Sequence, residues 1–307
     1  MRADRVELVE VSPRDGLQNE PEIVDTQTKI TLIERAIAAG VRRIETASFV
    51  HPGRVPQMAD AEAVMAGLPE RTAEVVTYIG LVLNKRGALR ALDTQVHELG
   101  AVAVASDGFG RANQGQTSAE TVKTAMEIVA LAQAQGRTAQ VTLSTAFGCP
   151  FDGEVDPDRV LAIVAELAQC RPREIALADT IGVAVPAQVA ALFERARAVA
   201  GDITFRAHFH NTRNTGVANV WAAIQAGASV VDASIAGLGG CPFAPKATGN
   251  VPTEDVLYML DRSGVTTGVT LDPIIETAAW LSDRLGRDLP GMVSRAGGFP
   301  PQLRGAI

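Results

Sequence analysis

Cysteine is scarce in this chain, and no two cysteines are spaced as a metal-binding pair. The 307 residues contain Cys149, Cys170 and Cys241, and none of them belongs to a C-x-x-C motif. An odd number of widely separated cysteines argues against both a disulfide framework and a structural zinc site. Nearly half of the residues are apolar, so we expect an apolar core to stabilise the fold.

The sequence also shows no basic stripe and no long uninterrupted apolar run, and we expect no N-terminal targeting segment. Its net charge is −7, and no Lys- and Arg-rich stretch is present to neutralise nucleic-acid phosphates. The longest apolar stretch, 217–240, is interrupted by Gln225, Asp232 and several glycines, which argues against a membrane span. The first ten residues lead directly into a predicted strand. We therefore expect a cytoplasmic protein with no nucleic-acid or membrane partner.

Short β-branched runs alternate with longer amphipathic stretches along the whole chain. The predicted strands are 6–10, 43–49, 74–82, 101–106, 139–145, 174–179, 203–208 and 229–235, and the clearest predicted helices are 28–39, 119–135 and 186–200. Gly40, Gly100, Gly136 and Gly227 are placed to end helices in the left-handed conformation. Eight such units, with no G-x-G-x-x-G after the first strand, predict an α/β fold of the (β/α)8 TIM-barrel type. We expect one catalytic domain over 1–307, ending in a short C-terminal helix (272–286) and a tail.

Polar side chains gather where the predicted strands end, which is where a barrel of this type carries its active site. These residues are Arg14, Asp15, Glu45, Asp179, Thr180, His208, His210, Asn211 and Cys241, with Asn250 and Glu254 soon after the last strand. Such residues are costly to bury without partners. The C-terminal face of the predicted barrel is therefore the candidate site.

His208 and His210 are the most specific local feature. Alternate residues of a strand share one face, so both imidazoles are expected to point into the barrel mouth. With Asp15 as a carboxylate and Asn250 as an amide, they would suit an octahedral Mg²⁺, Mn²⁺ or Co²⁺ better than a closed zinc site. The alternative is an ordinary pair of hydrogen-bonded histidines.

The other two histidines are assigned no function. His51 follows the second strand in a loop, and His97 is expected on a helix.

Arg14 is the expected partner of Glu45, because a carboxylate inside an apolar strand needs a cation. Adjacent residues on a strand point in opposite directions, so a turn after Arg14 is needed for both Arg14 and Asp15 to reach the mouth. Asp179 is likewise a carboxylate at the end of an apolar strand, so it also needs a partner if it is buried. For each of these residues the alternative is a purely structural internal ion pair.

The three cysteines differ in their surroundings. Cys241 follows a GLGG stretch and is a candidate proton donor on a loop above the metal site, with a buried apolar role as the alternative. Cys149, in FGCP after the fifth strand, is the weaker competitor, and Cys170 is expected to be structural on a helix.

Five segments together resemble a known family. They are VEVSPRDGLQNE (9–20), IETASFVHPGRVPQMAD (44–60), ADTIGVAVP (178–186), AHFHNT (207–212) and AGLGGCPFAPKATGNVPTED (236–255). The chain resembles the 3-hydroxy-3-methylglutaryl-CoA (HMG-CoA) lyases, which belong to a larger group of metal-dependent barrel lyases and Claisen-condensing synthases. The resemblance spans nearly the whole chain, and GLGGCP followed by TGN and ED is typical of the lyase branch.

The resemblance implies roles for individual residues. It makes Asp15, His208, His210 and Asn250 the ligands of a divalent metal, Mg²⁺ or Mn²⁺. It places Arg14 against the thioester oxygen and makes Cys241 the catalytic thiol. It also implies functional roles for Glu45, Asp179 and Glu254 around the metal. The implied reaction is cleavage of HMG-CoA to acetyl-CoA and acetoacetate, with Asp15 or His208 as the base.

Two departures from the family pattern concern the substrate. Asn211 stands where the family usually has Asp, next to the metal ligands, and the loop 106–115 lacks the usual serine- and glutamate-containing pattern. Isohexenylglutaryl-CoA or citramalyl-CoA is therefore an alternative ester, a Claisen-condensing synthase is a weaker alternative, and a non-catalytic barrel is weaker still. The candidate coenzyme A contacts are Asn84, Lys85, Arg86, Arg111 and Asn113. A homodimer is expected on general grounds.

Overall fold

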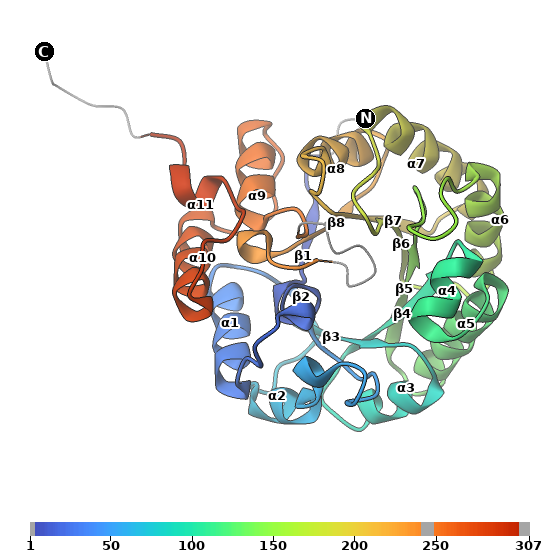
Figure 1. Ribbon diagram of the computed structural model, residues 1–307, viewed down its shortest axis with the longest axis horizontal. Helices are drawn as coiled ribbons and strands as arrows, with labels where there is room; N and C mark the ends of the chain where they lie inside the picture. The colour runs from blue at the N-terminus through green and yellow to red at the C-terminus, as the bar shows by residue number, and fades with distance from the viewer. Residues whose placement is uncertain (1–3, 241–248, 301–307) are drawn as a thin grey trace, which may run out of the picture.

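The computed structural model describes residues 4–240 and 249–300, and its centre is a closed barrel of eight parallel strands (Figure 1). The strands are β1 (Glu7–Glu10), β2 (Arg43–Ser48), β3 (Thr77–Val82), β4 (Glu98–Val104), β5 (Thr138–Ser144), β6 (Glu174–Asp179), β7 (Thr204–Phe209) and β8 (Val230–Ala233). Each strand pairs with the next along the chain, and β8 pairs with β1 to close the ring. The predicted (β/α)8 barrel is confirmed.

Helices surround the barrel on the outside, as Figure 1 shows. Those that follow the eight strands are α1 (Thr26–Ala38), α2 (Ala61–Gly67), α3 (Lys85–Leu92), α5 (Ser118–Ala134), α6 (Pro157–Ala168), α7 (Pro186–Ala200), α8 (Gly216–Gln225) and α9 (Thr253–Arg262). The described ranges add α4 (Asp107–Gln114), α10 (Leu271–Leu285) and α11 (Val293–Ala296). The predicted C-terminal helix is therefore present as α10.

A layer of buried charge closes the amino-terminal end of the barrel. Arg43, the first residue of β2, is 1% exposed and lies 2.6 Å from a Glu98 oxygen and 2.9 Å from a Glu174 oxygen. Glu98 and Glu174 are themselves the first residues of β4 and β6. Paired charges of this kind persist inside a protein because each partner offsets the other's desolvation. Open space for a ligand is consequently found at the opposite, carboxyl end of the strands.

Three local expectations were wrong. Gly100 does not end a helix but lies inside β4, where a Cβ atom would sit 3.0 Å from Nε2 of Gln140. His97 is not helical: it lies between α3 and β4, where its Nδ1 accepts the backbone N–H of Tyr78. The segment 106–115 is not a loop, since it contains helix α4. Gly40, Gly136 and Gly227 do adopt the left-handed φ values that were expected.

In the described part of the chain, no helix combines the length and apolar character that a bilayer crossing needs.

Candidate functional site

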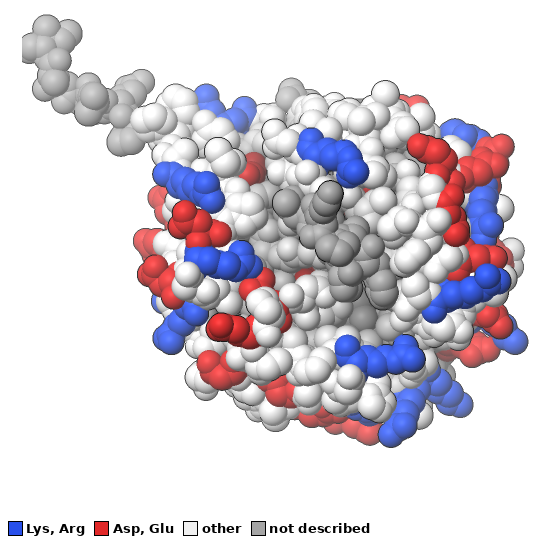
Figure 2. All heavy atoms as spheres, viewed as in Figure 1, with Lys and Arg blue, Asp and Glu red and all other residues white. Residues whose placement is uncertain are grey.

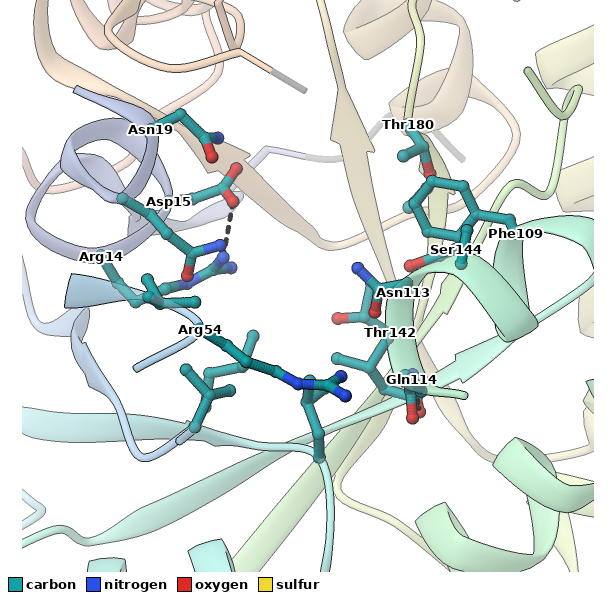
Figure 3. Close-up of a pocket in the computed structure, with 18 of the residues that line it drawn as sticks. Arg14, Asp15, Asn19, Arg54, Phe109, Asn113, Gln114, Thr142, Ser144 and Thr180 are labelled. Atoms are coloured by element: carbon teal, nitrogen blue, oxygen red, sulfur yellow. Dashed lines mark hydrogen bonds and ion pairs between the residues drawn. The ribbon is translucent and has the colours of Figure 1, made fainter. Parts of the chain in front are cut away.

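A cavity of about 710 Å³ opens at the carboxyl ends of the strands. Its lining includes Arg14, Asp15, Gln18, Asn19, Arg54, Asn84, Phe109, Asn113, Gln114, Thr142, Ser144, Thr180, His208 and His210. In the close-up of Figure 3, Arg14 and Asp15 lie on one side of this space and Phe109, Asn113 and Thr142 on the other. The polar residues predicted at the strand ends therefore include several that face one shared cavity.

A helical turn brings Arg14 and Asp15 to the cavity together. Strand β1 ends at Glu10, as predicted, and Ser12–Gly16 forms a five-residue helical turn. The buried carboxylate of Glu10 accepts the backbone N–H groups of Ser12 and Ile235 and the hydroxyl of Thr253, which ties the turn to the end of β8. The sequence analysis predicted a turn that lets both side chains reach the barrel mouth, and this turn is present.

Arg14 bridges two carboxylates at the bottom of the site. Its Nη1 lies 2.5 Å from Asp15 Oδ1, and its Nη2 lies 2.7 Å from Glu45 Oε2. Burial raises the pKa of Glu45, although the Arg14 guanidinium opposes that shift. The expected pairing of Arg14 with Glu45 is confirmed.

Asp15, His208 and His210 form the one cluster of potential metal ligands found among the described residues, and one ligand atom from each lies within 4.8 Å of the others. His208 is near the end of β7, His210 follows that strand, and their ring centroids are 5.4 Å apart. Burial alone would raise the pKa of Asp15, but Arg14 and the two imidazoles lower it to about 2. The carboxylate is thus held in its charged, metal-binding form.

Asn250, the fourth predicted ligand, lies beside Asp15. Its side-chain amide donates to Asp15 Oδ2 at 3.0 Å and to the carbonyl oxygen of Leu238 at 3.3 Å. The remaining oxygen, Oδ1, is buried and has no hydrogen-bond partner among the described residues. A buried oxygen without a partner is costly unless a ligand satisfies it. Two imidazoles, a carboxylate and this amide oxygen fit a divalent cation.

Asp232 is a buried contact of this cluster that the sequence analysis did not single out as a site residue. Its Oδ2 lies 2.9 Å from Nδ1 of His208, and its Oδ1 lies 3.4 Å from the guanidinium of Arg206. Burial by itself lowers the pKa of His208, whereas the hydrogen bond to Asp232 raises it, and the net shift is upward. Asp232 could have been found from the sequence, because it is a carboxylate inside the apolar run 229–235. Glu45 was identified in the same way.

The side chains of Asp179 and Asn211 accept backbone N–H groups, and neither residue is among those that line the cavity. The Asp179 carboxylate accepts the backbone N–H groups of Val183 and Ala184, and burial raises its pKa. Asn211 does not border the metal ligands through its side chain: its Oδ1 accepts the N–H of Gly216 at 2.9 Å, at the start of α8. The effect of Asn211 on the charge near the metal ligands stays a prediction.

Glu254 is buried at the start of α9, away from the residues that line the cavity. One oxygen accepts the backbone N–H of Ala236 at 3.0 Å, and the other, Oε1, has no hydrogen-bond partner in the described ranges. Burial raises the Glu254 pKa from 4.5 to about 7. Because Ala236 adopts a left-handed φ of 62°, this contact holds a strained turn after β8.

We expect Glu254→Gln to stabilise the fold increasingly as pH rises. The pKa of Glu254 is raised on folding, so its stabilisation is complete below pH 4.5 and is lost as pH rises towards 7. The glutamine side-chain oxygen can still accept the backbone N–H of Ala236, but the amide does not ionise as pH rises. The difference in unfolding free energy should reach about 3 kcal/mol above pH 7, measured by urea unfolding from pH 4.5 to 8. Glu276→Gln, exposed on α10, is the control; a pH-independent difference would contradict the assignment.

The cysteines lie in different surroundings. Cys241 lies outside the described residues. Cys149 is buried, and its sulfur accepts the N–H groups of Phe151 and Asp152, so it is bound within its own turn. Cys170 is not on a helix, contrary to expectation: it lies two residues after α6, where its thiol donates to the carbonyl oxygen of Leu167.

The candidate coenzyme A residues only partly line the cavity. Asn84 and Asn113 do, whereas Lys85, Arg86 and Arg111 are exposed and are not among the lining residues. The Asn84 side chain also accepts the N–H of Gly87 at the start of α3. In Figure 2, Lys and Arg side chains (blue) stand around the middle of this face.

Arg54 was missed by the sequence analysis. Its side chain reaches into the cavity in Figure 3, and its guanidinium has no hydrogen bond or ion pair with any described residue. Only its place in the VHPGRVP segment after the second strand could have pointed to it.

Comparison with family models decides the family. The HMGL-like model matches residues 5–281, which include all eight strands and the whole cavity lining. The chain belongs to the HMGL-like family. The resemblance seen in its sequence segments is thereby confirmed.

Individual relatives agree over nearly full length. The chain is 44% identical to the (R)-citramalyl-CoA lyase of Chloroflexus aurantiacus, covering 98% of this chain and 97% of that protein. It is 39% identical to the hydroxymethylglutaryl-CoA lyase YngG of Bacillus subtilis, covering 93% and 95%. An HMG-CoA lyase structure from Acinetobacter baumannii, in complex with coenzyme A and 3-methylmalate, matches with a TM-score of 0.92, at 38% identity over 99% and 98% of the two chains. This chain is a carbon–carbon lyase.

Proposed function

We propose that the chain cleaves the C2–C3 bond of HMG-CoA and releases acetyl-CoA and acetoacetate. The observation that carries the proposal is the convergence of Asp15, His208 and His210 on one point of the cavity, beside the Arg14 guanidinium. A hydroxymethylglutaryl-CoA lyase at 39% identity supports the same substrate.

The proposal includes a divalent metal, Mg²⁺ or Mn²⁺, held by Asp15, His208, His210 and Asn250. The unpartnered Oδ1 of Asn250 supports this set. When bound, such an ion supplies Lewis acidity that lowers the pKa of the substrate's 3-hydroxyl group. The protein's part is to hold the four ligands, which come from the turn after β1, the end of β7 and the segment before α9, around one position.

Cleavage begins with removal of the proton from the 3-hydroxyl group. We assign this step to Asp15, which lines the cavity and has a second carboxylate oxygen to accept the proton. His208, the other candidate base, also lines the cavity, but its Nδ1 is engaged by Asp232 and its Nε2 is assigned to the ion. The oxygen then forms the ketone of acetoacetate, and the electrons of the C2–C3 bond pass into the thioester as an enolate. Every atom of the substrate is accounted for once C2 receives a proton.

Arg14 is assigned to the thioester oxygen, where negative charge develops. Each of its two terminal nitrogens contacts one carboxylate, Asp15 or Glu45, and carries a second N–H group that can donate to the substrate. A fixed donor of this kind stabilises an enolate in the manner of an oxyanion hole. Glu45, which fixes the guanidinium, acts through Arg14. Asp179 and Glu254 act through the turns that they hold.

The proton that C2 receives is assigned to Cys241 on the family resemblance. Among the described cysteines, Cys149 is not part of the cavity lining and its sulfur is bound in its own turn. A thiol donor is well suited to an enolate carbon because it transfers a proton at neutral pH.

Coenzyme A is assigned to the outer part of the cavity. Asn84 and Asn113 line it, and Lys85 and Arg111 lie exposed on α3 and α4 at the same end of the barrel. Arg54 adds a guanidinium without a partner among the described residues, which suits a phosphate or a carboxylate.

Citramalyl-CoA is the second candidate substrate, favoured by the lyase of that name at 44% identity. It is also a 3-hydroxy-3-methyl acyl-CoA with a free carboxylate, one methylene shorter than HMG-CoA, and its cleavage would give acetyl-CoA and pyruvate. Helix α4 contributes Phe109, Asn113 and Gln114 to the cavity wall, so the 106–115 segment is placed to select between such esters.

We expect the purified protein, with Mn²⁺, to cleave HMG-CoA with a higher kcat/KM than citramalyl-CoA or isohexenylglutaryl-CoA. Citramalyl-CoA lacks one methylene, which changes binding by about 1–3 kcal/mol, so HMG-CoA should be preferred over it on the order of 10- to 200-fold. Chromatographic identification of acetoacetate or pyruvate separates the reactions. A higher kcat/KM for citramalyl-CoA would retain the mechanism and transfer the assignment to that substrate.

The proposal treats residues 1–307 as one catalytic domain that acts in the cytoplasm as a homodimer, the commonest symmetric assembly.

A further inference from the structure

Asp232 connects the metal-ligand cluster to the charged interior of the barrel. It lies on β8, is 4% exposed, and its Oδ2 is 2.9 Å from Nδ1 of His208. The register that pairs Ala207 with Val231 puts His208 level with Asp232 one residue further along. The contact therefore follows from the pairing of two neighbouring strands.

We propose that Asp232 is a positioning residue that orients His208 for metal binding. The carboxylate accepts the Nδ1–H of His208, which leaves Nε2 as the nitrogen with a lone pair for the ion. This inference rests on the proposed metal site. Asp232 is not among the residues that line the cavity.

The two sides of the His208 ring support this assignment. Asp15, a member of the ligand cluster, lies 3.8 Å from Nε2, whereas Asp232 lies on the Nδ1 side. One carboxylate thus lies beside the metal-facing nitrogen and the other lies behind the ring. A hydrogen bond behind the ring fixes both its tautomer and its rotation.

Asp232 is itself held in place by Arg206. The guanidinium of Arg206 lies 3.4 Å from Asp232 Oδ1 and 3.4 Å from Glu174 Oε1, and it donates to Gln140 Oε1 and Thr142 Oγ1. These partners come from β5, β6 and β8, and Arg206 is 2% exposed. The acceptor for His208 is therefore fixed by a network that spans half of the barrel.

The test is Mn²⁺ affinity of the metal-free full-length protein, followed by the electron paramagnetic resonance signal of free Mn²⁺. Loss of a carboxylate behind a ligating histidine typically weakens metal binding about 10- to 100-fold. We expect Asp232→Asn to weaken Mn²⁺ binding about 10-fold, because an amide is a poorer acceptor for Nδ1–H. Glu98→Gln, which removes a buried carboxylate from the amino-terminal layer, should leave the affinity unchanged.

A double-mutant cycle separates positioning from general destabilisation. In a His208→Ala background, Asp232→Asn should cause no further loss, because the residue through which it acts is gone. An equal loss in both backgrounds, or an unchanged affinity in the single variant, would overturn the proposal. Should Asp232→Asn fail to fold, Asp232→Ala combined with Arg206→Gln removes the acceptor and both charges of that pair, and is expected to weaken binding towards 100-fold. Absence of Mn²⁺ binding by the parent protein would instead contradict the metal site itself.

Discussion

Arg14→Gln is expected to lower kcat about 100- to 1,000-fold with a small change in KM. Loss of one fixed donor to a developing oxyanion costs roughly this factor. The effect should be confined to kcat because Arg14 is assigned to charge that appears only after the C2–C3 bond begins to break. Steady-state kinetics at saturating Mn²⁺ measure both constants.

Arg14→Lys is the matched control. It retains a positive charge between Asp15 and Glu45, which lie 2.5 and 2.7 Å from the guanidinium, but it removes the fixed fork of guanidinium N–H donors. We expect an intermediate kcat with Mn²⁺ affinity close to that of the parent. If Arg14→Gln retains kcat within about threefold of the parent at saturating metal, Arg14 does not stabilise the enolate.

Asp15→Asn is expected to weaken Mn²⁺ binding by more than about 100-fold. This loss is larger than that expected for a residue that only hydrogen-bonds to a metal ligand, which is about 10- to 100-fold. Asp15 supplies the single carboxylate of the ligand cluster, and Arg14 and the two imidazoles lower its pKa to about 2. The amide preserves the shape of the side chain but removes the charge. Calorimetric titration of metal-free protein with Mn²⁺ gives the affinity.

Asp152→Asn serves as the control for Asp15→Asn. Asp152 follows β5 and accepts the N–H of Gly108 at 2.8 Å, but it is outside the ligand cluster. Its replacement should leave Mn²⁺ affinity unchanged. Equal affinities for Asp15→Asn and the parent protein would exclude Asp15 as a ligand.

The barrel was predictable because its strands are buried on both faces. β2, β3, β6 and β8 are buried at every residue, and parallel strands of this kind appear as short continuous apolar runs. Helix α4 was not predictable, since its sequence, DGFGRANQ, contains two glycines of low helix propensity. Gly100 was misassigned because a glycine after a helical stretch and a glycine inside a strand look alike in sequence.

The ligand cluster was predictable for a different reason. His208 and His210 share a face by strand alternation, and a barrel gathers its strand ends at one face. The contact between Asp232 and His208 depends on the register between β7 and β8, which no single segment encodes. The inward direction of Arg54 depends in the same way on the path of a loop.

The most direct test of a metal-dependent carbon–carbon lyase is the stoichiometry of HMG-CoA cleavage before and after removal of bound metal with EDTA. We predict one acetyl-CoA and one acetoacetate per ester consumed, loss of turnover after EDTA treatment, and recovery on addition of Mg²⁺ or Mn²⁺. Unchanged turnover by protein whose metal content has been shown to be negligible would contradict the role assigned to Asp15, His208, His210 and Asn250.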